Sequence, residues 1–60
     1  MYTLTAIFCE ADHGIANGKT WPVTIGRNYA TVSHALHDIE RLKMKYHGSN
    51  VEIIDYTITH

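Results

Sequence analysis

A single segment with helical periodicity, residues 31–47, stands among segments that alternate apolar and polar residues, and this order limits what the chain can fold into. Residues 2–9, YTLTAIFC, are rich in β-branched and aromatic residues, which favour a strand. Residues 20–25, TWPVTI, and residues 51–60, VEIIDYTITH, alternate in the same way. The sequence therefore predicts the order β-β-α-β.

The first two strands are expected to form a hairpin that turns at Asn17-Gly18, because this pair favours a two-residue type I′ turn. Pro22 has no backbone donor, which places the second strand at a sheet edge. The turn pairs even residues of the first strand with odd residues of the second, although a bulge near His13-Gly14 would shift this register. One face of the hairpin is then expected to carry Leu4, Ala6, Phe8, Trp21, Val23 and Ile25.

Residues 31–47 predict one amphipathic helix that is capped by Thr31 or Ser33 and followed by Gly48. At 100° per residue, the apolar side chains fall within an arc of roughly 120°. This core face comprises Val32, Ala35, Leu36, Ile39, Leu42 and Tyr46. The opposite side carries His34, His37, Asp38, Arg41 and Lys45.

A right-handed crossover through the helix returns the last strand beside the first. We therefore expect a single small domain over residues 1–60 with an α+β fold, in which a three-stranded antiparallel sheet of order 2-1-3 carries the helix on one face. Strict alternation in the last strand turns Ile54, Tyr56 and Ile58 toward the helix. The same alternation turns Val51 and Ile53 away from it.

The small size and the single cysteine limit how this domain can be stabilised. Sixty residues bury a modest core, and small domains often add disulfides, a metal or oligomerisation. Cys9 is the only cysteine, so no internal disulfide can form. A lone cysteine without a signal-like apolar stretch favours the cytoplasm, and no apolar run is long enough to span a bilayer.

Charge and motif spacing argue against nucleic-acid binding and catalysis. The chain has five basic and six acidic residues, with a formal charge of −1, and lacks the clustered Lys and Arg that phosphate contacts need. His34 and His37 are three residues apart beside Asp38, whereas the zinc-protease helix spaces its histidines four apart. A solvated helix face is the simpler interpretation, so we expect no catalytic residue, no metal and no cofactor.

Two surfaces are candidates for binding another protein. The uncovered sheet face is expected to hold an apolar centre among threonines, and apolar patches mark interfaces; its residues are Thr3, Thr5, Ile7, Val51, Ile53, Thr57 and Thr59. The last strand also offers a free edge, so a homodimer is expected through the sheet face or this edge. The second surface is the helix face of His34, His37, Asp38, Arg41 and Lys45. The alternative for the sheet face is an ordinary polar outer surface.

The hairpin strands, the helix from Thr31 to His47 and the closing strand VEIIDYTITH resemble, in order and length, small phage-encoded inhibitors of host proteins, such as the phage inhibitor of bacterial RNA polymerase. The order also resembles that of sheet-helix antitoxins of the HicB type. The resemblance implies a non-enzymatic protein, encoded by a phage or mobile element, that blocks a larger host protein of transcription or defence in the bacterial cytoplasm. It assigns no functional residue. The alternatives are a dimeric nucleic-acid-binding regulator or antitoxin-like protein, and a small metal enzyme that uses His34, His37 and Asp38.

Overall fold

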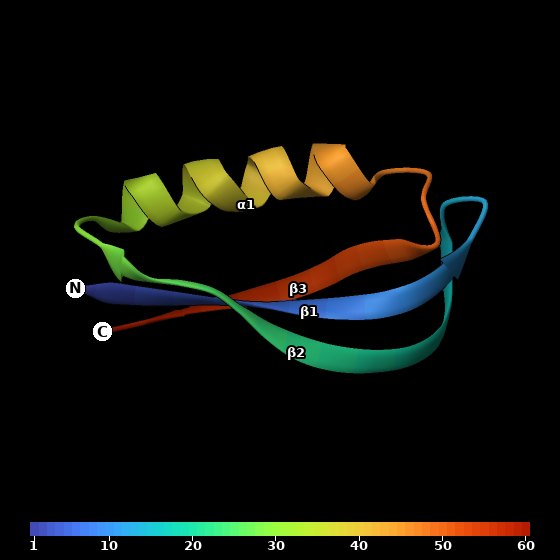
Figure 1. Ribbon diagram of the computed structural model, residues 1–60, viewed down its shortest axis with the longest axis horizontal. Helices are drawn as coiled ribbons and strands as arrows, with labels where there is room; N and C mark the ends of the chain where they lie inside the picture. The colour runs from blue at the N-terminus through green and yellow to red at the C-terminus, as the bar shows by residue number, and fades with distance from the viewer.

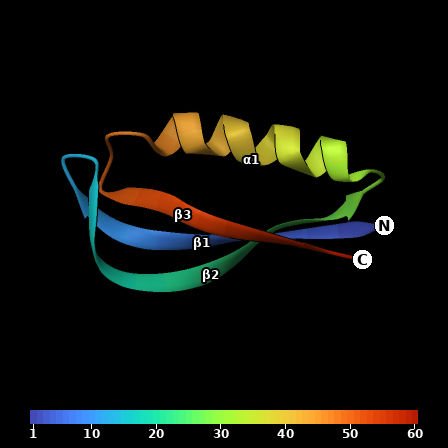
Figure 2. The same ribbon diagram turned by 180° about the vertical axis from the view of Figure 1, so that it is seen from behind.

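The computed structural model describes all residues, 1–60, as one antiparallel sheet with a helix on one of its faces (Figure 1). The elements are β1 (Tyr2–Asp12), β2 (Ile15–Tyr29), α1 (Val32–Tyr46) and β3 (Val51–Thr59). The strand order is β2-β1-β3, with β1 in the middle, and the view from behind shows the same arrangement (Figure 2). The predicted α+β fold, the element order and the 2-1-3 sheet are confirmed.

The hairpin between β1 and β2 turns at His13-Gly14, so the predicted turn at Asn17-Gly18 is wrong. Both turn residues have positive φ, 51° and 80°, as a type I′ turn requires, and Asp12 pairs with Ile15. Asn17 and Gly18 instead lie inside β2. The sequence offers two pairs that suit a tight turn, Asn17-Gly18 and His13-Gly14, and the chain turns at the second.

A bulge in β2 explains how Asn17 and Gly18 fit into a strand. Cys9 pairs with Thr20 and Ala11 pairs with Ala16, so residues 17–19 of β2 all face the single residue Glu10. A Cβ atom at Gly18 would lie 2.6 Å from Cβ of Glu10, so only glycine permits this close approach. The backbone bends here, and the tip of the hairpin curls toward the end of α1 (Figure 1).

The predicted face of the hairpin is confirmed despite the changed turn. Ala6 pairs with Val23 and Phe8 pairs with Trp21, which keeps these even residues of β1 beside odd residues of β2. A further register shift at Ile25 pairs Leu4 with Gly26, and Ile25 still packs against the core. The rings of Phe8 and Trp21 are stacked with centroids 6.1 Å apart. The buried core cluster consists of Leu4, Ala6, Phe8, Tyr29, Ala35, Ile39 and Ile53.

A bulge in β3 overturns the predicted faces of its first half. Ile7 pairs with Asp55 but Phe8 pairs with Ile53, so Ile54 is an extra residue without a partner on β1. One extra residue moves every preceding side chain to the other face. Ile53 is therefore buried in the core and Val51 packs against it, whereas Ile54 is 49% exposed. The predicted positions of Val51 and Ile53 on the outer face, and of Ile54 on the core face, are wrong.

Helix α1 begins and ends with the predicted signals but buries a narrower face. Oγ1 of Thr31 accepts a hydrogen bond from N of His34 at 3.1 Å, which confirms Thr31 as the cap. Gly48 has a φ of 79° just beyond the helix. Ala35 and Ile39 are fully buried, while Val32 and Leu36, at the rim of the predicted arc, are 41% and 36% exposed.

Strand β2 extends to Tyr29, beyond the segment 20–25 that the alternation predicts as a strand. A Cβ atom at Gly26 would lie 2.9 Å from Cε2 and 3.0 Å from the hydroxyl oxygen of Tyr29. The tyrosine ring therefore covers the glycine, as aromatic side chains do where a strand contains glycine. Gly26 allows Tyr29 to be buried beside α1.

We expect the Gly26→Ala variant to lose about 1–3 kcal/mol of unfolding free energy, the usual cost of overpacking a core. The added methyl group would displace the ring of Tyr29, which is only 8% exposed and hydrogen bonded to Asp38. Urea denaturation followed by circular dichroism measures the loss. The exposed Thr24→Ala variant on the same strand is the control, with a change within about 0.5 kcal/mol. Equal stability of the two variants would contradict this packing.

Candidate protein-binding groove

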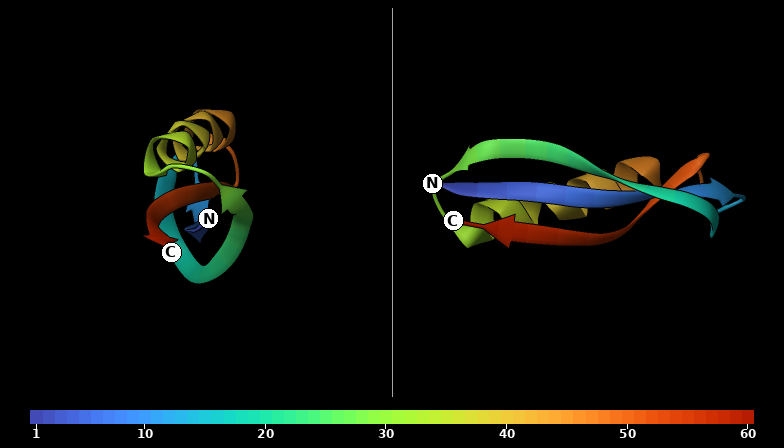
Figure 3. Two further views of the ribbon diagram at one scale, coloured as in Figure 1. Left: turned by 90° about the vertical axis from the view of Figure 1, so that its left-hand side faces the viewer. Right: turned by 90° about the horizontal axis from the view of Figure 1, so that it is seen from below.

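The helix covers only part of the sheet. An α-helix with its side chains is about 10–12 Å wide and neighbouring strands lie about 4.8 Å apart, so one helix covers roughly two strands. α1 packs mainly against β3 and β1 and contacts β2 least. Figure 1 shows β2 as the strand farthest from α1 along most of its length, and Figure 3 shows the three strands side by side from below. The helix-facing side of β2 is thus left partly open.

A groove of about 610 Å³ lies between α1 and β2. β2 contributes Ile25 and Tyr29, and the apolar side chains of Leu42 and Met44 come from α1. Polar side chains of α1 complete the lining at Asp38, Arg41 and Lys45. Three of the five residues predicted for the helix face therefore meet at this groove. The sequence did not predict the apolar half, because that half depends on where the helix sits across the sheet.

Tyr29 and Asp38 form the polar contact at one end of the groove. The Tyr29 hydroxyl donates a hydrogen bond to Oδ2 of Asp38 at 2.8 Å, and Nη1 of Arg41 lies 3.7 Å from Oδ1 of Asp38. Burial raises the pKa of Tyr29 above its usual 10.0, and the hydrogen bond to Asp38 and the charge of that carboxylate raise it further. The phenol is therefore protonated at neutral pH, and its hydrogen bond to Asp38 connects β2 to α1.

We expect the Tyr29→Phe variant to lose about 1 kcal/mol at neutral pH, because it lacks the hydrogen bond to a partly exposed carboxylate. Since the pKa of Tyr29 is raised in the folded state, its contribution is full below pH 10.0 and is lost as pH rises through the raised pKa. The stability gap between wild type and variant should then narrow at high pH. Denaturation curves of both proteins across this range measure the gap, and a gap independent of pH would contradict the linkage.

The exposed charges along the groove are positive. The Arg41 side chain is 73% exposed, whereas the Asp38 side chain is 28% exposed and already accepts the Tyr29 hydroxyl. Lys45 is exposed one turn further along α1, and its Nζ lies 5.8 Å from the centroid of the Tyr46 ring. The exposed charged side chains of the groove lining are therefore the two cations, Arg41 and Lys45.

The two histidines of the predicted helix face lie outside the groove lining. His34 makes an edge contact with the ring of Tyr29, with centroids 5.3 Å apart, and His37 is exposed. The structure contains no group of three or more His, Cys, Asp or Glu side chains arranged to hold a metal ion.

The outer face of the sheet is more polar than predicted. Thr3, Thr5 and Ile7 occupy it on β1, and Thr57 and Thr59 pair with Thr5 and Thr3 from β3. Val51 and Ile53 are on the opposite face, so Ile7 is left between Pro22 and Asp55 rather than in an apolar centre.

Cys9 is buried at the β2 bulge, where its thiol lies 3.5 Å from the carbonyl oxygen of Gly18.

Both edges of the sheet carry features that hinder the addition of another strand. Oδ1 of Asp55 accepts a hydrogen bond from N of Tyr56 at 2.8 Å, so this backbone donor on β3 is already satisfied. The bulge at Ile54 also interrupts β3, and on β2 Pro22 has no donor to offer. Bulges, charges and proline are the usual protection of edge strands.

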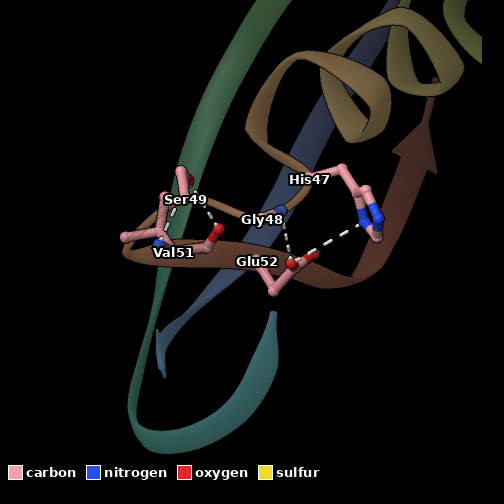
Figure 4. Close-up of polar contacts among 5 residues, drawn as sticks. All are labelled: His47, Gly48, Ser49, Val51 and Glu52. Carbon is pink, nitrogen blue, oxygen red and sulfur yellow. Dashed lines mark hydrogen bonds and ion pairs between the residues drawn. The ribbon is translucent and has the colours of Figure 1, made fainter. Parts of the chain in front are cut away.

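A polar junction fixes the connection from α1 to β3 (Figure 4). Oε1 of Glu52 accepts a hydrogen bond from N of Gly48 at 3.3 Å and lies 4.0 Å from Nδ1 of His47. Oγ of Ser49 donates to the carbonyl oxygen of Val51 at 3.0 Å. These contacts hold the end of α1 to the start of β3.

No helix in the structure has the length and apolar character needed to cross a lipid bilayer. Comparison of the chain with protein-family models, curated proteins and solved structures found no match.

Proposed function

We propose that this chain is a non-enzymatic protein-binding module whose docking surface is the groove between α1 and β2. The observation that carries the proposal is the uncovered apolar side of β2, where Trp21 is 37% exposed and Ile25 lines the groove. Met44, on the helix side of the groove, is 80% exposed. The groove itself is lined by the exposed Met44 and the half-buried Ile25 and Leu42, with a polar rim, and this arrangement is typical of a protein interaction site.

A binding role fits the polar groups of the groove better than a catalytic one. The Tyr29 hydroxyl donates to Asp38, and its raised pKa keeps it protonated at neutral pH, so it is poorly suited to act as a base. Cys9 is buried on a different part of β1 and does not line the groove.

In its more specific form, the proposal is that the module is an inhibitor encoded by a phage or mobile element. Its partner would be a larger protein of transcription or defence in the cytoplasm of a bacterial host. Support comes from the resemblance in element order. Steric or allosteric block is the expected mechanism.

Site-specific crosslinking in a bacterial lysate tests the proposal. A photoreactive benzoylphenylalanine replaces Met44 in the groove or Thr57 on the outer sheet face, and a tag at either terminus lies at the opposite end of the molecule from the end of α1 (Figure 1). We expect one protein to be crosslinked from position 44 and not from position 57. Crosslinking from position 57 alone, or from neither position, would overturn the groove as the docking surface.

Activity of the crosslinked protein, purified and assayed with and without the module, tests the inhibitor form separately. An inhibitor lowers that activity when the complex is saturated. Full activity in the saturated complex would contradict inhibition while leaving the binding site intact.

A further inference from the structure

We propose that the occupant of the groove is an amphipathic α-helix of another protein that carries acidic side chains beside its apolar face. This inference rests on the proposed function and names the chemistry of the partner. Packed helices lie about 8–10 Å apart, the distance of about two strand spacings. A helix beside α1 would therefore lie directly over β2 and complete the second layer of the fold.

The apolar row of β2 has the spacing that a helix needs. Trp21, Val23 and Ile25 are successive residues of one strand face and span about 13 Å, since a strand rises about 3.3 Å per residue. Apolar residues at positions i, i+3 or i+4, and i+7 of a helix span about 10 Å along its axis. One apolar helical stripe is thus similar in length to the row.

The backbone favours a helix over an added strand as the partner. A strand would have to pair with an edge, and the β2 edge contains Pro22 and the bulge at residues 17–19. A helix satisfies its own backbone and needs only side-chain contacts. The open feature of β2 is its helix-facing side, which suits side-chain contacts.

The charges at the groove select an acidic helix. Arg41 and Lys45 are four residues apart on α1 and both are exposed. Arg41 lies 3.7 Å from Asp38, a carboxylate that also accepts the Tyr29 hydroxyl, whereas Lys45 has no acidic partner in the chain. Acidic residues of a neighbouring helix would pair with these cations at the rim. A second copy of this chain docked groove to groove about a two-fold axis would instead bring the Arg41 and Lys45 of both copies into one interface, which is less favourable than pairing them with an acidic partner.

Titration of the ¹⁵N-labelled protein with synthetic helical peptides tests the inference. The first peptide carries leucines at i, i+3, i+4 and i+7 with glutamates beside them, the second has lysines in place of the glutamates, and the third has the composition of the first in scrambled order. We expect the acidic peptide to shift the amide resonances of Ile25, Leu42 and Met44 and to bind at least about tenfold more tightly than the lysine peptide. Tenfold corresponds to about 1.4 kcal/mol.

Charge reversal supplies the matched control. The Arg41→Glu/Lys45→Glu double variant should invert the preference toward the lysine peptide. Both side chains are exposed, so the variant is expected to fold, and the milder Arg41→Gln/Lys45→Gln pair should abolish the preference without inverting it. Circular dichroism confirms the fold of each variant.

Three results would overturn the inference: equal binding of the two charged peptides, equal binding of the scrambled peptide, or shifts confined to the outer sheet face. Concentration-dependent dimerisation that shifts the groove resonances without any peptide would assign the groove to a second copy and would also overturn it. The proposed function and this inference can fail separately. If a protein is crosslinked from position 44 but no helical peptide binds, the docking surface is upheld and only the helical occupant is rejected.

Discussion

Replacing Ile39 with alanine is expected to remove about 2–5 kcal/mol of unfolding free energy, the usual cost of truncating a buried isoleucine. Ile39 is fully buried, and it lies in the core cluster that joins α1 to the sheet. Domains have about 0.05–0.15 kcal/mol of stability per residue, so a chain of this length has only about 3–9 kcal/mol in total. The loss is therefore a large fraction of the total stability, and the Ile39→Ala variant is expected to unfold at a much lower urea concentration than the wild type.

Leu36→Ala is the matched control for this prediction. Leu36 lies on the same helix and is 36% exposed, so its truncation leaves less of a cavity. Urea denaturation followed by circular dichroism compares the two variants, with a much smaller loss expected at position 36. Similar losses at both positions would show that the helix docks with a different face from the one described.

The Met44→Glu variant is expected to weaken binding of the crosslinked partner by at least about tenfold, or 1.4 kcal/mol. Met44 lines the groove while 80% of it is exposed, so glutamate places a charge in the docking surface without disturbing the core. The change in unfolding free energy should stay within about 0.5 kcal/mol. Titration calorimetry with the purified partner measures the affinity, and denaturation measures the stability.

Ile54→Glu provides the comparison for this loss of affinity. Ile54 is an exposed apolar residue, 49% accessible, but it lies on β3, at the other edge of the sheet. The same substitution there should leave the affinity unchanged. If Ile54→Glu weakens binding and Met44→Glu does not, the β3 edge is the contact surface.

The order of elements and the helix could be predicted because their signals are local. Thr31 and Gly48 mark the ends of α1, and the apolar spacing identifies Ala35 and Ile39 as its buried side. The sheet order followed from the handedness of the crossover. These features depend on a few neighbouring residues or on chain connectivity, which the sequence displays directly.

The bulges at residues 17–19 and at Ile54 could not be predicted from alternation. The alternation in VEIIDYTITH is compatible with either Ile53 or Ile54 facing the core. Which of the two is buried depends on how β3 pairs with β1. Similarly, Asn17-Gly18 has the composition of a hairpin turn, but His13-Gly14 takes that place and the close approach of Gly18 to Glu10 makes a bend. In both cases strand pairing decided between locally acceptable alternatives.

Half of the groove lining could be predicted from the sequence. The polar side of α1 indicates Asp38, Arg41 and Lys45 as candidate contact residues, and all three line the groove. Tyr29 could not be predicted, because the alternation that marks its strand ends at Ile25. The openness of β2 depends on the lateral position of α1 over the sheet, which helical periodicity does not determine.

The most direct test of the groove as the docking surface is an NMR footprint of the purified partner on the ¹⁵N-labelled module. We predict that amide resonances of Ile25, Tyr29, Leu42 and Met44 shift or broaden on binding, while those of Thr3, Thr5, Thr57 and Thr59 on the outer sheet face do not. A footprint centred on those threonines, with the groove resonances unchanged, would contradict the account.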